Sequence, residues 1–137
     1  VSDTRIVVSK SRFEVDMNRP RDKAIYLKSE DAWGLNIWKK EPDIEIINQS
    51  LEYYDYFYSQ AMKVLKDLEE RFGKFVVFDI HSYNHRRKGP NESPASADEN
   101  PEINIGTGTM NRSIWAPVVD RFLTDLKNFQ FQGRYLD

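Results

Sequence analysis

One long amphipathic pattern, from residue 42 to residue 72, constrains the fold of this chain more than any other feature. Apolar side chains recur along it at spacings of three and four, and charged or amide side chains fill the opposite side. Pro42 suits the first turn of a helix, Asp43 and Glu45 suit the positive end of its dipole, and Gly73 suits the position after its last residue. The pattern predicts a helix over Pro42 to Phe72. We expect its apolar stripe to be buried against a sheet, with three leucines in the stripe: Leu51, Leu65 and Leu68.

The residues that follow this helix predict a strand that ends in polar side chains. Residues 75–80 are mostly β-branched or aromatic, which is typical of a strand buried on both faces of a mainly parallel sheet. A helix, a glycine and a strand form the return half of a crossover unit, so the order predicts an α/β fold. Ligands of open α/β sheets bind outside the carboxyl ends of the strands, where Asp79 and His81 are expected to lie. A histidine that only hydrogen-bonds a neighbouring loop is the alternative interpretation of His81.

Other short segments are typical of strands and of the turns and helices that connect them. Residues 5–8 are mostly β-branched and residues 11–16 alternate between polar and apolar, and both patterns predict strands. Residues 102–105 predict another strand, followed by a glycine turn at 106–109 that lacks the spacing and the lysine of a phosphate-binding loop. A second helix is expected to begin between Ser113 and Pro117, because proline is not tolerated deep inside a helix.

A polar segment with an arginine before a proline follows the expected strand at 11–16. Pro20 disfavours the helical conformation at Arg19 and favours an extended one. An extended arginine beside Asn18 can present a planar fork of hydrogen-bond donors to a carboxylate. The alternative is a surface ion pair between Arg19 and either Asp16 or Asp22. From these residues alone, both interpretations stay open.

The composition excludes several classes of protein and partner. The chain has 137 residues, of which 39% are hydrophobic and 31% are charged, as expected for one soluble globular domain. The net charge of −2 gives no long-range attraction to nucleic acid or to anionic lipid. The absence of cysteine excludes disulfides and thiolate metal sites and agrees with a reducing compartment. No apolar run approaches the roughly 20 residues of a membrane span. We therefore expect a cytoplasmic protein that binds neither nucleic acid nor membranes.

Three segments together carry a resemblance to a known family. Residues 11–21 contain Arg followed by Asp-Met-Asn-Arg-Pro, residues 79–82 read Asp-Ile-His-Ser, and residues 102–107 read Glu-Ile-Asn-Ile-Gly-Thr. In this order they resemble the motifs of the N-formylglutamate amidohydrolase family, and they span most of the chain. The resemblance implies a three-layer α/β/α fold with a mixed, mostly parallel sheet, like that of the zinc carboxypeptidases and aspartoacylases, of which this chain would hold a part.

The same resemblance implies a reaction, a cofactor and a set of site residues. The reaction is hydrolysis of the amide of an N-acylated acidic amino acid, a small-molecule carboxylate substrate, and the cofactor is zinc. His81 matches a zinc ligand of the family, while Asn18 and Arg19 match the residues that grip the substrate carboxylate. Asp79 and Ser82 are expected to orient the groups around the metal. A catalytic zinc takes three protein ligands and leaves one position for a water, whose pKa it lowers.

Part of such a site is absent from the sequence. Neither histidine is followed by a glutamate three residues later, as the family's first two ligands require, and no residue stands out as the catalytic glutamate. His85 is a possible additional ligand. Because the chain opens without methionine and stops soon after an expected helix, we expect residues 1–137 to form a single domain that is a fragment of a longer hydrolase domain. The alternative is a non-catalytic domain of the same fold that binds a small carboxylate or a protein partner.

Overall fold

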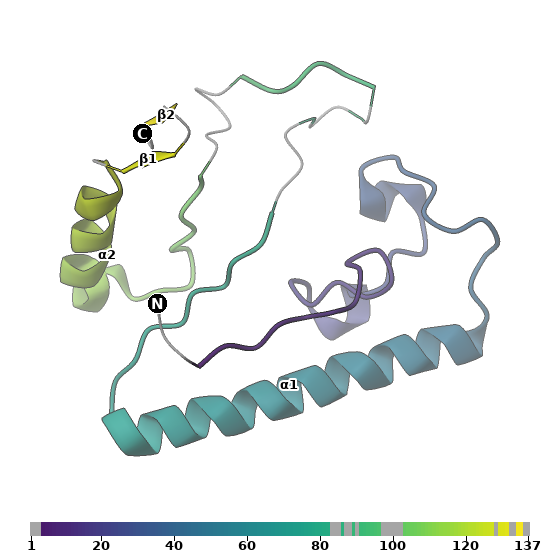
Figure 1. Ribbon diagram of the computed structural model, residues 1–137. Coiled ribbons are helices and arrows are strands. Elements are labelled where there is room, and N and C mark those ends of the chain that lie inside the picture. Colours follow the sequence, from purple (N-terminus) through teal and green to yellow (C-terminus); the bar gives the residue numbers. More distant parts are fainter. Residues whose placement is uncertain are drawn as a thin grey trace. The chain divides into compact units, whose positions relative to one another are not determined.

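The computed structural model of the protein describes residues 4–82, 86, 89, 91–96, 103–127, 129–131 and 134–135. The chain divides into two compact units, Val1–Tyr83 and Asn84–Asp137. The helices and strands, in chain order, are the 3-10 turns η1 (Arg21–Lys23) and η2 (Ser29–Ala32), the helices α1 (Ile44–Phe72) and α2 (Arg112–Lys127), and the strands β1 (Gln130–Phe131) and β2 (Arg134–Tyr135) (Figure 1).

Helix α1 ends at the residue that the sequence predicts and begins two residues later than predicted. The side chain of Asp43 accepts a hydrogen bond from the backbone N–H of Ile46 at 3.0 Å, which satisfies one of the free donors of the first turn. Gly73 follows the last helical residue with a φ of +69°, and its N–H donates to the carbonyl of Glu69 at 2.8 Å. The predicted helix is therefore confirmed, and it starts at Ile44 instead of Pro42.

The burial of α1 differs from the prediction. Within this helix only Ser50 and Tyr54 are buried, and both lie in its first half. The three leucines expected in the core (Leu51, Leu65 and Leu68) are half-buried. The prediction that they are fully covered is therefore wrong, because an amphipathic pattern shows which face of a helix can pack but not what packs on it.

The core of the first unit lies where the N-terminal segment contacts the first half of α1. Val15, Ala24 and Tyr54 form its buried cluster, with Met17 and Tyr53 packed against it. The segment reaches this position through tight turns: the N–H of Val15 donates to the carbonyl of Ser11 at 3.1 Å, and that of Asp16 to Ala24 at 2.7 Å. Residues 11–16 therefore form turns, and the predicted strand there is wrong.

The predicted three-layer α/β/α fold with a mostly parallel sheet is also wrong. Among the described residues the strands are β1 and β2, which pair antiparallel with Gln130 opposite Tyr135. The described part of the expected strand, residues 74–82, belongs to no sheet, and within it Val77 is 60% and Ile80 is 89% exposed. β-branched residues favour an extended backbone, but burial on both faces of a sheet requires neighbouring strands and covering helices. Apolar composition alone supplies neither.

The second unit contains α2 and the hairpin of β1 and β2 (Figure 1). The predicted second helix is confirmed, and it begins at Arg112, one residue before the expected range. Asn111 precedes it, and its carbonyl accepts the N–H of Trp115 at 3.1 Å. Pro117 lies inside the helix, where its ring removes the N–H that would bond four residues back. Val119 is the buried residue of this helix.

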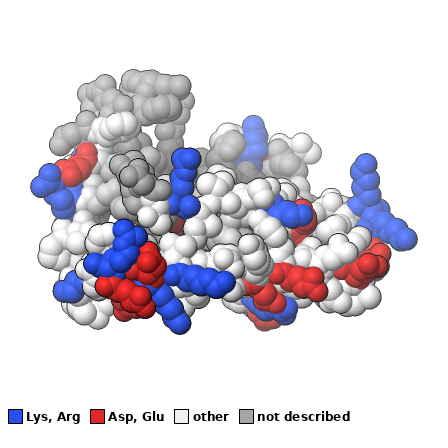
Figure 2. All heavy atoms as spheres, turned by 60° about the horizontal axis from the view of Figure 1, so that its bottom comes forward, with Lys and Arg blue, Asp and Glu red and all other residues white. Residues whose placement is uncertain are grey.

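Charge and hydropathy on the described surface are mixed. On the face drawn in Figure 2, basic and acidic side chains are interspersed, and neither sign covers a continuous area. None of the helices formed by the described residues combines the length and the apolar character needed to cross a bilayer.

Candidate functional site

Two of the predicted site segments meet in the first unit, although the residues that join them are 63 positions apart. The side-chain amide Nδ2 of Asn18 lies 3.1 Å from Nε2 of His81. The other ring nitrogen of His81, Nδ1, lies 3.3 Å from Oδ1 of Asp79. The tautomer that satisfies both contacts has its hydrogen on Nδ1, so that His81 donates to Asp79 and accepts from Asn18. The three side chains are exposed and form one hydrogen-bonded row.

Arg19 lies beside this row, over aromatic rings. Its guanidinium carbon is 4.9 Å from the ring centroid of Tyr26 and 5.8 Å from that of Trp33. Its Nε is 3.9 Å from Oδ2 of Asp16, and its Nη2 donates to the carbonyl of Asp31 at 3.4 Å. The interpretation of Arg19 as an ion-pair partner of Asp16 thus has support, but the contact is long and the carboxylate is buried. The polar contacts of Arg19 are long for hydrogen bonds, which leaves its donors available.

Asp16 is the buried acceptor around which the site is arranged. Its carboxylate is 2% exposed and accepts hydrogen bonds from the N–H of Asn18 at 2.9 Å, from Nη2 of Arg12 at 3.0 Å and from the hydroxyl of Tyr26. Burial raises the pKa of Asp16, but the hydrogen bonds from Tyr26, Asn18 and Arg12 outweigh it and hold the pKa below its ordinary value. Asp16 is therefore ionised at neutral pH.

Sequence reasoning missed the role of Asp16 as this shared acceptor. The signal that could have identified it is its position two residues before Asn18, because an aspartate often accepts the backbone N–H two residues ahead and so closes a turn. The contact also affects Tyr26, whose pKa is raised by burial and then by the neighbouring carboxylate.

Arg12 links the Asp16 turn to the segment that carries His81. Besides its bond to Asp16, it donates through Nη1 to the backbone carbonyl of Ser82 at 3.4 Å. Its Nε is buried with no hydrogen-bond partner among the described residues. Its guanidinium lies 5.6 Å from the ring centroid of Trp33. Ser82, which the sequence predicts to orient neighbouring groups, takes part in this arrangement through its backbone carbonyl.

Two tyrosines of α1 hold the backbone on either side of Asn18. The hydroxyl of Tyr54 donates to the carbonyl of Arg19 at 2.8 Å, and the hydroxyl of Tyr58, one turn later, donates to the carbonyl of Met17 at 2.7 Å. Burial first, and then the hydrogen bond with Tyr58, raise the pKa of Tyr54 to about 12. Figure 1 shows the N-terminal segment running alongside α1, as these contacts require. The helix thus positions the predicted carboxylate-binding residues.

An ion pair adds to this attachment. Nε and Nη2 of Arg21 donate to the two carboxylate oxygens of Asp55, at 2.7 and 2.8 Å. The hydrogen bond from Arg21 lowers the pKa of Asp55. Because both side chains are about half exposed, solvent screens the pair and it contributes little to stability. Its fork geometry, however, sets the orientation of η1 on α1.

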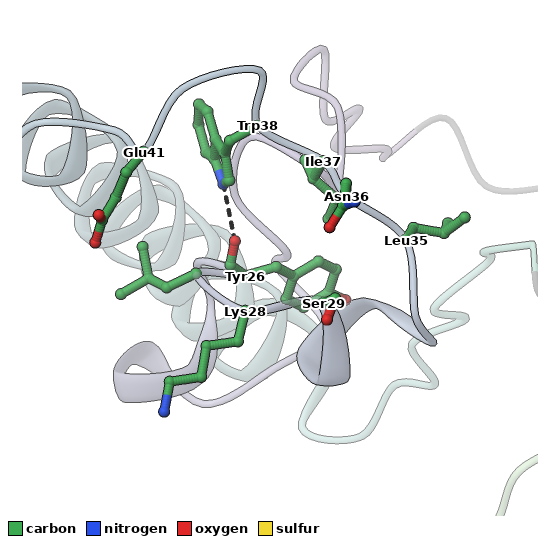
Figure 3. A pocket seen from close by; sticks show the side chains of 9 residues that line it. Tyr26, Lys28, Ser29, Leu35, Asn36, Ile37, Trp38 and Glu41 are labelled. Atoms are coloured by element: carbon green, nitrogen blue, oxygen red, sulfur yellow. Dashed lines mark hydrogen bonds between the residues drawn. The ribbon is translucent and has the colours of Figure 1, made fainter.

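A small pocket adjoins the site on the backbone side of Tyr26. Its volume is about 290 Å³, at the small end of the range for ligand pockets. Figure 3 shows Trp38 with its indole N–H donating to the carbonyl of Tyr26, a bond of 2.8 Å. Polar side chains from several positions contribute to the lining: Lys28, Ser29, Asn36 and Glu41. Tyr26 therefore belongs both to this pocket and to the Asp16 cluster.

Trp33 lies beside Tyr26, one of the residues that line this pocket. Trp33 packs its ring edge-on against Tyr26, with the ring centroids 5.9 Å apart, and it also faces both guanidinium groups. It is 42% exposed. Trp33 is therefore a partly exposed aromatic wall beside the two arginines.

The donors present are of the kind that zinc takes, but they are too few for a complete site. His81 and Asp79 offer a ring nitrogen and a carboxylate, whereas a zinc site needs three or four protein ligands. In the part of the chain that the structure describes, no three His, Cys, Asp or Glu side chains are grouped as a metal site. His85, considered as an additional ligand, lies outside the described residues.

Comparison with known proteins identifies one family. A family model described as N-formylglutamate amidohydrolase matches residues 2–136, nearly the whole chain. The matched range includes both segments that meet at Asn18 and His81. No curated protein and no solved structure matches the chain.

Proposed function

The chain belongs to the N-formylglutamate amidohydrolase family, and we propose that it hydrolyses the amide bond of an N-acylated acidic amino acid such as N-formylglutamate. In this reaction one water is added across the amide. The acyl carbon keeps the oxygen of the water and leaves as formate, and the nitrogen takes up a proton and leaves as the amine of glutamate.

The observation that carries this proposal is the contact between Asn18 and His81. Asn18 belongs to the segment that resembles the family's carboxylate-binding motif, and His81 belongs to the segment that resembles its metal-binding motif. The two side chains lie 3.1 Å apart in the folded chain although their residues are 63 positions apart in the sequence. A substrate carboxylate held at the first segment therefore lies next to the second.

In the proposed site Arg19 and Asn18 bind a carboxylate of the substrate. The guanidinium of Arg19 offers a planar pair of N–H donors, and Asn18 adds an amide donor. Tyr54 and Tyr58 fix the carbonyls on either side of Asn18, so the donors are oriented before the substrate arrives. Asp79 fixes the orientation of the His81 ring through Nδ1.

Zinc is the cofactor that we expect, with His81 as one of its ligands. When bound, zinc would polarise the amide carbonyl and lower the pKa of a bound water. A neutral imidazole has one lone pair. Asn18 and a metal ion would therefore compete for Nε2 of His81, while Asp79 keeps its bond to Nδ1 with either partner.

The test is formate release by the full-length, zinc-loaded protein from N-formylglutamate and from its α-carboxamide. Replacing Arg19 by lysine keeps the positive charge but removes the fork. We expect Arg19→Lys to lower kcat/KM for N-formylglutamate by about 10- to 100-fold, since a hydrogen bond to a charged group contributes about 1.5–3 kcal/mol. The loss should be smaller for the α-carboxamide, and the melting temperature should stay nearly unchanged.

Arg71→Lys is the matched control. Arg71 also pairs with a carboxylate, that of Asp67 at 3.1 Å, and also lies over an aromatic ring, that of Phe72 at 5.1 Å, but it is not part of the site. This variant should leave both activities and the melting temperature unchanged. An equal loss on both substrates in Arg19→Lys would make Arg19 a structural residue. A wild-type protein that binds acidic amino acids without releasing formate would be a non-catalytic binding domain instead.

A further inference from the structure

Tyr26 lies buried beneath the candidate site and contacts two parts of it. The residue is 1% exposed. Its hydroxyl donates to Oδ2 of Asp16, and Oδ1 of the same carboxylate accepts the backbone N–H of Asn18 at 2.9 Å. One carboxylate therefore joins the phenol of Tyr26 to the backbone of Asn18.

The ring of Tyr26 lies next to the guanidinium of Arg19, with its centroid 4.9 Å from the guanidinium carbon. Phe13 and Trp33 pack against the ring in edge-on contacts, with centroid distances of 6.4 and 5.9 Å. Such contacts fix the position of a buried ring. A guanidinium is attracted to an aromatic face and keeps its N–H edges for a carboxylate. The fixed ring therefore orients Arg19.

Hydrogen bonds also fix the backbone around Tyr26. The indole N–H of Trp38 donates to the carbonyl of Tyr26 at 2.8 Å (Figure 3). Two residues before Tyr26, the carbonyl of the buried Ala24 accepts the N–H of Asp16 at 2.7 Å. The short segment that carries Tyr26 is thus held at both ends, and its hydroxyl meets Asp16 at a fixed place.

The protonation states suit this arrangement. Burial and then the neighbouring carboxylate raise the pKa of Tyr26 above its ordinary value of 10.0, so the hydroxyl stays protonated and donates at neutral pH. Burial raises the pKa of Asp16, and among the groups that lower it the hydroxyl of Tyr26 has the largest effect. Tyr26 therefore helps to keep Asp16 ionised as the acceptor for Asn18.

We propose that Tyr26 is a positioning residue that orients both Asn18 and Arg19 for the substrate. Its hydroxyl acts on Asn18 through Asp16, and its ring acts on Arg19 directly. Because Tyr26 is 1% exposed, it works through these neighbours and not by contact with the substrate. This inference rests on the proposed function, in which Asn18 and Arg19 bind a substrate carboxylate, and it adds a residue to which that function assigns no role.

Tyr26→Phe tests the hydroxyl, because it keeps the ring beside Arg19. In the full-length, zinc-loaded protein it should lower kcat/KM for N-formylglutamate by about 10-fold, since a small displacement of positioned groups is costly. The loss should be smaller for the α-carboxamide, because the displaced donors bind the carboxylate. The control Tyr56→Phe removes a hydroxyl from a residue of α1 that is 64% exposed, and it should leave both activities unchanged.

Double variants separate positioning from a general loss of structure. Because the hydroxyl acts through Asn18, Tyr26→Phe should have a much smaller effect on kcat/KM in an Asn18→Ala background. Because the ring acts on Arg19, the same holds for Tyr26→Leu in an Arg19→Lys background. Changes that act independently give additive losses. Additive losses in both pairs would overturn the inference and make Tyr26 a structural residue.

Calorimetric titration with L-glutamate, a product of the proposed reaction, measures the site without catalysis. Tyr26→Phe should weaken binding by about 10-fold, and Tyr56→Phe should keep the wild-type affinity. Asp16→Asn breaks the same connection at its other end and should also weaken binding. An unchanged affinity in Asp16→Asn would overturn the inference, so the test holds even if Tyr26→Phe does not fold.

The proposed function and this inference fail in different ways. Formate release by wild type, with activity and affinity unchanged in Tyr26→Phe, would overturn the inference and leave the function. Weaker glutamate binding by Tyr26→Phe, without formate release by wild type, would leave the positioning role and overturn the hydrolase activity. A wild type that neither binds glutamate nor releases formate would overturn both.

Discussion

The two halves of α1 carry similar apolar stripes but are covered to different extents. The first half contains both buried residues of the helix, Ser50 and Tyr54. In the second half Met62 is 52% and Phe72 is 61% exposed, and the extended segment that follows, with Val77 and Ile80, is exposed as well. The same periodicity therefore gives fully buried residues in the first half only, although exposed apolar side chains such as Ile44 occur there too.

The difference shows that polar anchors, and not the apolar stripe alone, determine where a segment docks on the helix. The first half of α1 binds the N-terminal segment through the hydroxyls of Tyr54 and Tyr58 and through the pair of Arg21 and Asp55. The hydroxyl of Tyr54 satisfies the carbonyl of Arg19 where it is partly buried, while the contact of Tyr58 and the pair of Arg21 and Asp55 lie at the surface. The candidate site lies at this docked half.

The largest effect is expected for Tyr54→Ala, which removes a side chain that holds the N-terminal segment on the first half of α1. Removing a buried aromatic side chain should lower the free energy of unfolding by about 3–5 kcal/mol, and the hydrogen bond to Arg19 is lost with it. Tyr54→Phe removes only the hydroxyl and should lower it by about 1 kcal/mol. Urea denaturation of the full chain, followed by circular dichroism, measures both.

Met62→Ala is the control on the exposed half of the same helix. Because Met62 is half exposed, the free energy of unfolding should fall by less than about 1 kcal/mol. Equal losses in Tyr54→Ala and Met62→Ala would mean that the two halves of α1 are equally packed, against the comparison drawn above.

A smaller effect is expected for Asp16→Asn, which removes the charge shared by the docked segment. Leaving Arg12 and Arg19 without this carboxylate should lower the free energy of unfolding by about 1–3 kcal/mol at pH 7. The pKa of Asp16 in the folded chain lies below its ordinary value of 3.8. Stability from the ionised group is therefore fully present above pH 3.8 and is lost as the pH falls through the folded pKa.

Denaturation at a series of pH values tests this assignment. The wild-type chain should lose stability below pH 3.8 by more than Asp16→Asn does, so the two curves should converge in acid. Parallel curves down to low pH would show that Asp16 does not contribute through its charge.

Gly73→Ala tests the end of α1, where the helix is followed by the extended segment. Alanine at a φ of +69° should lower the free energy of unfolding by about 1 kcal/mol, although a Cβ there would meet nothing within 4 Å. Gly106→Ala is the matched control, since the same open space surrounds it without a positive φ. A thermal melt of both variants, with no difference between them, would argue against the left-handed turn at Gly73.

The smallest effect is expected for Ile80→Ala in the extended segment. Since Ile80 is 89% exposed, its truncation should change the free energy of unfolding by no more than about 0.5 kcal/mol. A loss of 2 kcal/mol or more, on the order of a packed core truncation, would show that this segment is covered in solution, and would weaken the contrast between the two regions.

Local patterns were sufficient to predict the helices and their ends. Three features predicted α1: the period of its apolar residues, Asp43 before its first residue and Gly73 after its last. They are sufficient because capping and amphipathicity act over a few neighbouring residues. The motifs also led to the family and to Asn18, Arg19 and His81 as candidate site residues. Their catalytic and binding roles stay predictions until the assays above are done.

Tertiary structure alone decided what these elements pack against. Residues 75–80 have the composition of a buried strand, but a sheet depends on partners distant in the sequence, and the described segment stays extended and exposed. The contact that brings Asn18 to His81 likewise joins segments far apart in the sequence, whereas Arg12 and Arg19 reach Asp16 from four and three residues away. The sequence by itself determined the residue types, the helix ends and the family. Folding decided that Asn18 meets His81, because this contact joins two segments that no local period relates.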